Sequence, residues 1–519
     1  MQQEWHPRHS PWLIAMGVMM ATFMEVLDTS IANIALPHIA GSLSATPEEA
    51  TWVLTSYLVS NAIVLPTTGW LANHFGRKRV FITCIAMFTL SSAMCGLAWS
   101  LPTLIFARVL QGIGGGAMVP IAQSIMLESF PRQKRGVAMA IFAQGVVVAP
   151  ILGPTLGGWI TDSYSWRWIF YINLPVGILA ILAAQWLVED PPYIQRNKSA
   201  TIDYVGFGLL AVWLATLQIL LDKGQEADWF GTVWVRWFTL ASVVSFAGFI
   251  GWQLKTKHPL VDLSVFKNRN FTIGLILMTT LGAILYGTTA QLPLFLQTLM
   301  GYPALQSGYA LSPRGIAAFV TTFFVGRLVG KMRAKWMLCI GFILLAASSF
   351  MLSHLNLQVG QINVIWPSVV NGIAISFIFV PLTTATMSQL AQQQLGNATG
   401  LYNLMRNLGG SIGIAFVTTM LARGAQTHQA LMVGHLAPDN PAFRQQLATA
   451  NHLLAHHADP VTSSRQAYNA VYSLLDQQAH LWAFVDNFFI FGALALVTMP
   501  LIFLFKRVAI PVKPVKPGH

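Results

Sequence analysis

Long apolar segments separated by short polar or basic turns recur along the whole chain. A run of about 18 or more apolar residues is long enough to cross a bilayer as a helix. About fourteen such segments are present, and they begin near residues 12, 50, 80, 102, 136, 168, 203, 234, 271, 307, 336, 364, 398 and 482. The pattern predicts an all-α membrane protein.

Composition supports this class and explains the basic charge. Of the 519 residues, 55% are hydrophobic and only 9% are charged, whereas a soluble domain has about 25% charged residues. Most of the 30 Lys and Arg fall in alternate loops, such as 75–79, 131–136 and 255–270. This positive-inside distribution predicts that both termini are cytoplasmic, so the net charge of +12 reflects topology and lipid contact. We expect no nucleic-acid partner.

Two sequence pairs indicate an internal repeat. Residues 69–79 resemble 326–335, and 109–120 resemble 369–381, at an offset of roughly 260 residues, as in secondary transporters built from two halves. We therefore predict a six-helix half (1–190), a linker with two further spans (191–256) and a second six-helix half (257–505), followed by a cytoplasmic tail (506–519). This is a 6+2+6 arrangement.

The polar segment 422–481 precedes the last predicted span and is expected to lie outside as a loop with short amphipathic helices. It holds six of the 13 His, but their spacing is irregular and no Cys joins them. We expect a solvated or partner-contacting surface there, and no metal site. The three Cys all fall within apolar segments, which indicates neither a disulfide nor a metal centre.

The first apolar segment carries two acids, Glu25 and Asp28. An acid at membrane depth is costly and is a functional candidate by default. Three residues apart, the two share one helix face about one turn apart. The alternative for Asp28 is a role in helix packing only. The alternative for Glu25 is a side chain that faces water or a polar neighbour.

Arg108 is a third charge within an apolar segment, and the repeat places the uncharged Ser368 at the equivalent point of the second half. A guanidinium beside an acid favours its ionised form, so movement of Arg108 can switch proton binding at Asp28. The alternative is that Arg108 only binds backbone carbonyls. Arg406 is a further intramembrane arginine, and its alternative role is structural.

Other candidates are grouped by residue type. Small residues and prolines in one segment permit close helix approach and bending, in a moving interface or in plain packing; they are Pro150, Gly153, Pro154, Gly157 and Gly158. Aromatic and amide side chains on segments expected to line a cavity are candidate substrate contacts, with lipid-facing or ordinary packing as the alternative; they are Phe23, Asn33, Trp52, Gln111, Tyr286, Gln291, Phe295, Asn371 and Phe379.

Several motifs occur in an order that resembles the fourteen-span drug:proton antiporters of the major facilitator superfamily. They are LDTSIANIALP (27–37), GWLANHFGRKR (69–79), LIFARVLQGIGGG (104–116), APILGPTLGG (149–158), WRWIFYINLPVG (166–177) and VDLSVFKNRNFTIG (261–274). The resemblance covers nearly the whole chain. It places Asp28 on the family's acidic position, Arg108 on the span-four arginine, and Gly69, Gly76 and Arg77 in the loop motif.

The resemblance implies a proton-coupled multidrug exporter of hydrophobic or cationic toxic compounds, with the proton as coupling ion and no other cofactor. Within the group it is similar to inner-membrane pumps of three-part exporters in Gram-negative bacteria, which implies a periplasmic membrane-fusion adaptor and an outer-membrane channel as partners. The lack of a GxxxxGK[ST] motif agrees with an ion gradient as the energy source.

The chain departs from the family pattern at Asn73, where the loop motif usually has an acid that pairs with cations and locks one conformation. Asn73 carries no charge, which puts the ionic lock in question and gives Arg77, Lys78 and Arg79 a mainly topological role. Glu25 lies outside the family motif, so its candidacy rests on the cost of a buried acid alone.

Two other function classes compete with an exporter. Uptake of one specific solute by a symporter or facilitator fits a repeat of six spans, but the 149–158 motif and the 6+2+6 arrangement count against it. A membrane sensor or enzyme needs a sensing or catalytic cluster, and no nucleophile, base or metal set is apparent. We therefore expect a transporter in which Asp28 takes the proton, alone or shared with Glu25, and a cationic substrate competes for the carboxylate.

Overall fold

The structure is a computed structural model that describes residues 7–131, 134–191, 203–257, 259–329, 331–434, 436–437, 439–454 and 460–506. All regular secondary structure in these ranges is helical. The helices are α1 (Pro11–Ser42), α2 (Pro47–Ala50), α3 (Trp52–Val64), η1 (Leu65–Thr67), α4 (Thr68–Phe75), α5 (Arg77–Leu97), α6 (Leu101–Gly116), α7 (Met118–Ser129), α8 (Arg135–Ser163), α9 (Trp168–Tyr171), α10 (Asn173–Leu187), α11 (Tyr204–Lys223), η3 (Trp229–Gly231), α12 (Val233–Lys255), η4 (Leu263–Lys267), α13 (Arg269–Thr298), α14 (Ala304–Leu328), α15 (Ala334–Leu352), α16 (Ile362–Met387), η5 (Gln392–Gln394), α17 (Leu395–Val433), α18 (Pro441–Leu454), α19 (Pro460–Thr498) and η6 (Met499–Leu504).

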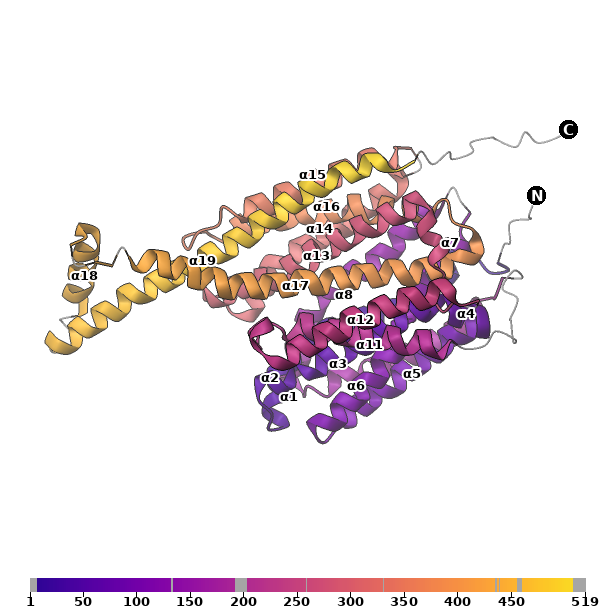
Figure 1. Ribbon diagram of the computed structural model, residues 1–519, viewed down its shortest axis with the longest axis horizontal. Coiled ribbons are helices and arrows are strands. Elements are labelled where there is room, and N and C mark those ends of the chain that lie inside the picture. The colour runs from indigo at the N-terminus through magenta and orange to yellow at the C-terminus, as the bar shows by residue number, and fades with distance from the viewer. Residues whose placement is uncertain are drawn as a thin grey trace.

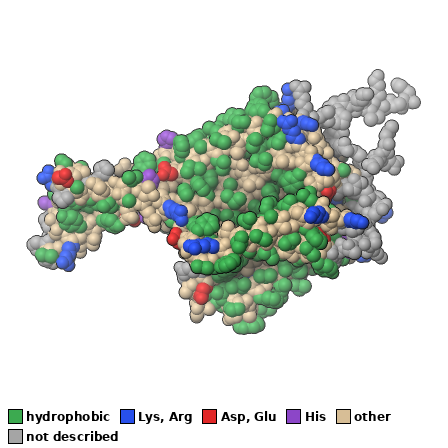
Figure 2. Space-filling model, viewed as in Figure 1, with side chains coloured by type: hydrophobic (Ala, Val, Ile, Leu, Met, Phe, Trp, Pro, Cys, Tyr) green, Lys and Arg blue, Asp and Glu red, His purple; other side chains and the backbone are tan. Residues whose placement is uncertain are grey.

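The all-α membrane architecture is confirmed. Within the described residues, eleven helical segments are long and apolar enough to cross a membrane. The predicted segments near 50, 136 and 307 are helical too, as α3–α4, α8 and α14, but they are not among the eleven. The number fourteen therefore stays a prediction. Figure 2 shows hydrophobic side chains over the body of the bundle, with most visible charges toward its two ends and on a projection.

That projection is formed by α17, α18 and α19. α18 is one of the short helices expected at 422–481, but the long helices on either side of it correct the expectation of a loop. α17 and α19 each run for 39 residues. The last helix begins at Pro460 rather than near 482. Both helices extend beyond the bundle, and α18 lies at the far tip, opposite the end at which α4 and α7 lie (Figure 1). Over the residues that the structure describes, the polar segment is therefore a helical hairpin that continues two spans.

We call the end where α5, α8 and α15 begin the basic end, because Arg77, Arg135 and Lys335 lie in their first turns. At this end the first half (α1–α10) packs directly on the second (α13–α19). A Cβ on Gly69 of α4 would lie 2.6 Å from the Asn397 backbone of α17. The Ser124 hydroxyl of α7 lies 2.8 Å from that of Thr399.

The contact continues one turn further along α17. Asn403 donates its amide to the Gln123 Oε1 at 2.6 Å. On the other side of the same end, a Cβ on Gly136 of α8 would lie 2.8 Å from the Val329 side chain that follows α14. The two halves are therefore closed on each other at the basic end.

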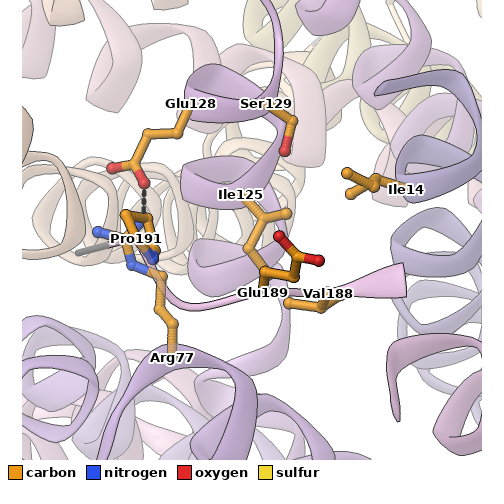
Figure 3. A pocket seen from close by; sticks show the side chains of 8 residues that line it. All are labelled: Ile14, Arg77, Ile125, Glu128, Ser129, Val188, Glu189 and Pro191. Carbon is orange, nitrogen blue, oxygen red and sulfur yellow. Dashed lines mark hydrogen bonds and ion pairs between the residues drawn. The ribbon is translucent and has the colours of Figure 1, made fainter. Parts of the chain in front are cut away.

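Arg77 has a structural role that the sequence analysis did not assign. Its guanidinium forms a buried ion pair with Glu128 at the end of α7 (Figure 3). A cavity of about 10 Å³ lies beside the pair, lined by Ile14, Ile125 and Glu189 among others. The expectation of a mainly topological Arg77 is therefore wrong: Glu128 supplies an acid for an ion pair in the loop-motif region, although Asn73 itself is exposed and uncharged. Gly76, with φ of +89°, makes the turn that directs Arg77 inward.

Gly69→Ala should weaken closure at the basic end, because the new Cβ meets backbone atoms of Asn397 that cannot rotate away. Overpacking of this kind costs about 1–3 kcal/mol, which shifts a two-state equilibrium by roughly 5- to 150-fold. Disulfide formation between cysteines placed at Ser124 and Thr399 measures closure. Gly158→Ala is the control, since no atom lies within 4 Å of its Cβ position. Equal cross-linking in both variants would contradict this account.

Candidate functional site

Both acids of α1 point into the first half of the bundle. The Asp28 residue is 2% exposed and Glu25 is 8% exposed. α1 is apolar on nearly every side, so these carboxylates are its main polar groups at this depth. The surrounding spans must supply donors to them, because a buried ionised group without partners costs several kcal/mol.

Asp28 has three side-chain donors from two other spans. Arg108 Nη1 of α6 donates to Oδ2 at 2.7 Å. Gln111 Nε2 donates to Oδ1 at 3.0 Å, and Asn173 Nδ2 of α10 donates to the same oxygen at 2.7 Å. The carboxylate therefore has both oxygens satisfied and is balanced by a full positive charge.

The remaining contacts of Arg108 fix its orientation. Its Nε donates to the Val53 carbonyl at 3.1 Å, and its Nη1 also donates to Gln111 Oε1 at 2.7 Å. The guanidinium carbon lies 4.3 Å from the centroid of the Tyr57 ring, which is a cation–π contact. Arg108 is fully buried. It binds a backbone carbonyl, as one alternative held, and it also pairs with Asp28.

Glu25 lies in a different environment, one turn from Asp28. Its Oε1 accepts hydrogen bonds from the Tyr57 hydroxyl at 2.9 Å and from the Asn61 amide at 3.3 Å. Both donors are neutral. Within the part of the chain that the structure describes, Glu25 forms no ion pair. The two acids therefore share a helix face, as predicted, but only Asp28 contacts a cation.

Arg406 of α17 is the cation of the second half that acts on Glu25 electrostatically. It is one turn from Asn403, on the α17 face that contacts the first half. The residue is 6% exposed, and its Nε and Nη1 atoms are buried without a hydrogen-bond partner among the described residues. Arg406 is therefore a buried cation on the face of α17 that contacts the first half.

The Gly- and Pro-rich segment of α8 packs on α1 beside the two acids. Ser30 donates its hydroxyl to the Pro150 carbonyl at 3.2 Å. Cβ positions on Gly153 and Gly157 fall against Ser30 and Ile31, so any side chain there would push the helices apart. Gly158 faces open space, and the Pro154 side chain is outside the described set. α8 therefore packs closely on α1 within one turn of Asp28.

The nine candidate substrate contacts fall into different surroundings. Gln111 hydrogen-bonds to Asp28 and Arg108. Phe295 and Phe379 are buried in apolar clusters. Phe23 is half-buried, Asn33 and Trp52 are exposed, and Tyr286 packs beside Gly410. Polar atoms of Gln291 and Asn371 are buried without a partner among the described residues. The surroundings of the nine differ from residue to residue, and their role as substrate contacts stays a prediction.

Three residues of the site were missed by the sequence analysis: Tyr57, Asn61 and Asn173. The sequence did contain a signal for the two asparagines. A lone amide within an apolar span is costly unless it has a hydrogen-bond partner, and the same holds for the two acids. Nothing in the sequence showed which of many such polar residues meet α1. Asn173 also donates to the Ser92 hydroxyl at 3.0 Å, so it links α10 to α5 as well as to α1.

Asp28→Asn should lower protein stability by about 3–5 kcal/mol, because it leaves Arg108 as a buried cation without its counterion. Combining it with Arg108→Gln should cost less than the sum of the two single substitutions. Thermal unfolding of detergent-purified variants completes the double-mutant cycle. Asp162→Asn is the control, because that carboxylate is 76% exposed. A loss no greater than that of the control would show that the pair is not structural.

Comparison with solved structures identifies the same fold. The human organic anion transporter MFSD10 superposes with a TM-score of 0.63 at 13% identity, covering 95% of this chain and all of that one. The proton:xylose symporter XylE gives a TM-score of 0.61 at 15% identity over 96% of this chain and 98% of that one. At these identities the likeness shows the fold alone.

Sequence relatives are much closer. The chain is 36% identical to the fatty acid resistance protein FarB of Neisseria gonorrhoeae, over 95% of this chain and 96% of that one. It is 38% identical to the multidrug export protein EmrB of Escherichia coli K12, over 83% and 84% of the two chains. It is 30% identical to the colistin resistance protein EmrB of Acinetobacter baumannii, over 93% and 94%. The Major Facilitator Superfamily model matches residues 18–414. This chain belongs to the Major Facilitator Superfamily of transporters.

Proposed function

We propose that this protein is a proton-coupled exporter of amphipathic toxic compounds in the bacterial inner membrane. The relatives named for multidrug export and for resistance support export. The observation that carries proton coupling is the pair of buried carboxylates on α1, of which one contacts a cation and the other does not. Both termini would be cytoplasmic, so the basic end would face the cytoplasm.

The contacts favour different roles for the two acids. Sequence reasoning assigns the proton to Asp28, but protonating Asp28 in this conformation would leave Arg108 buried and uncompensated. Protonating Glu25 would cost no ion pair and would keep the hydrogen bond from the Tyr57 hydroxyl. We therefore assign Asp28 as the counterion that holds Arg108, and Glu25 as the carboxylate that exchanges protons while the basic end is closed.

Charge across the boundary connects this proton to movement. An ionised Glu25 attracts Arg406 of the other half and stabilises closure at the basic end. A proton that reaches Glu25 from the outside removes this attraction, so that the halves can separate at the basic end. Release of the proton to the cytoplasm then restores the attraction, and closure returns the transporter to the outward-open state. Protons would thus enter while substrate leaves.

The proposal includes a periplasmic adaptor and an outer-membrane channel. If the basic end is cytoplasmic, the hairpin of α17, α18 and α19 projects into the periplasm (Figure 1). Its exposed apolar side chains include Tyr468 and Tyr472, which lie one turn apart on the protruding part of α19. Such a surface suits contact with another protein.

Glu25→Gln should abolish uphill efflux while leaving passive exchange of substrate intact, because the amide keeps the shape of the side chain but cannot carry a proton. The test measures accumulation of a fluorescent cationic dye in everted vesicles, with and without a protonophore, beside dye exchange without a gradient. We expect a loss of at least about tenfold in uphill transport only. Protonophore-sensitive accumulation by the variant would rule out Glu25 as the carrier. Wild-type transport that is insensitive to the protonophore would rule out proton coupling.

A further inference from the structure

A groove between α15 and α16 lies apart from the site that α1, α3 and α6 form. Its volume is about 620 Å³, and it opens where α15 ends and α16 begins. α15 begins at the basic end and has 19 residues, so it rises about 28 Å. That rise is close to the ~30 Å thickness of the hydrocarbon core of a bilayer. The groove therefore lies at the membrane boundary opposite the basic end.

The wall of the groove is apolar and continues as a stripe along α15. Phe350 and Met351 of α15 and Trp366 of α16 line the groove, and Met351 is 43% and Trp366 59% exposed. Toward the basic end, the exposed Ile343 and Ile340 lie on the same face of α15 as Met351, within about 80° around the helix. From Met351 to Ile340 the helix covers about 17 Å, close to the ~15 Å depth of one leaflet. The stripe therefore fits one extended alkyl chain.

The rim of the groove toward the α15–α16 loop is polar. His354 Nδ1 lies 2.7 Å from the Phe350 carbonyl, which can only accept, so Nδ1 carries the proton and Nε2 of the neutral ring is an acceptor. The Asn356 Oδ1 accepts a backbone N–H two residues on at 2.8 Å, which leaves its NH₂ group as a donor. Pro367 has no N–H, so the Asn363 carbonyl lacks the usual helical donor. The rim thus offers acceptors beside an amide donor.

The charge of the groove narrows the class of ligand. Among the described residues that line it, none is Lys, Arg, Asp or Glu. A ligand with a net charge would meet no counter-charge there, whereas a ligand that carries both an ammonium and a phosphate brings its own balance. The ammonium N–H groups can donate to His354 Nε2 and the Asn363 carbonyl, and the phosphate can accept from the Asn356 amide.

We propose that this groove binds one phospholipid of the leaflet opposite the basic end. Its phosphoethanolamine headgroup occupies the polar rim, and one acyl chain follows the stripe of α15 from Met351 to Ile340. The Trp366 ring lies against the start of that chain. Both helices belong to the second half, so the lipid does not link the halves, and its site is separate from the boundary at which Glu25 and Arg406 lie.

The test is native mass spectrometry of the delipidated full-length protein, titrated with three phospholipids that share palmitoyl and oleoyl chains. Phosphatidylethanolamine should bind about tenfold more tightly than phosphatidylcholine, whose methyl groups remove the N–H donors, and than the anionic phosphatidylglycerol. Trp366→Ala should weaken phosphatidylethanolamine binding by about 5- to 30-fold through lost apolar contact. Trp336→Ala is the matched control, because that ring is 56% exposed on the same helix, α15, at the basic end.

His354→Phe tests the headgroup contact separately, since it keeps a ring and removes the Nε2 acceptor. It should lower the affinity for phosphatidylethanolamine to near that for phosphatidylcholine and leave the latter unchanged. Equal losses in Trp366→Ala and Trp336→Ala would show only general lipid contact and refute the proposal. Equal binding of the three lipids, an unchanged preference in His354→Phe, or detergent or an alkylammonium dye bound in place of lipid would each overturn it. If Trp366→Ala cannot be purified, His354→Phe decides alone.

Discussion

The buried ion pair between Asp28 and Arg108 is the constraint on which the first half depends. Two opposite charges are removed from water at the centre of α1 and α6, and each also hydrogen-bonds to further groups from α3, α6 and α10. Such a pair is costly to form and more costly to break. It therefore fixes the rotation of α1, and this rotation in turn places Glu25 on the face that meets Tyr57, Asn61 and the boundary with the second half.

The two acids of α1 therefore differ in where their charge is balanced. Asp28 has its cation within the same half, so movement between the halves need not disturb it. The hydrogen bonds to the Glu25 carboxylate come from neutral donors of its own half, and Arg406, whose Nε and Nη1 lack partners among the described residues, belongs to the other half. The charge balance of Glu25 therefore depends on whether the halves are closed at the basic end. In the proposed mechanism a proton on Glu25 alters that balance, which is what coupling requires.

Much of this architecture was predictable because the membrane imposes simple rules. Apolar segment length predicted the helices, and the cost of a buried charge identified Glu25, Asp28 and Arg108 before any contact was known. The partners of those charges were not predictable, since Asn173 and Asn61 are far from α1 in sequence and only packing brings them together. The Arg77–Glu128 pair was missed because the expected acid was sought at Asn73, within the loop motif. The long hairpin was missed because its polar composition is typical of a loop, whereas α17 and α19 continue through it as helices.

The central claim is that Glu25, not Asp28, takes the proton while the basic end is closed. Infrared difference spectroscopy on acidification measures this directly, through the C=O stretching band of a protonated carboxylic acid. The account predicts that the band gained by the wild-type protein is lost in Glu25→Gln and retained in the Asp28→Asn, Arg108→Gln double variant. Loss of the band in the double variant, with retention in Glu25→Gln, would contradict it.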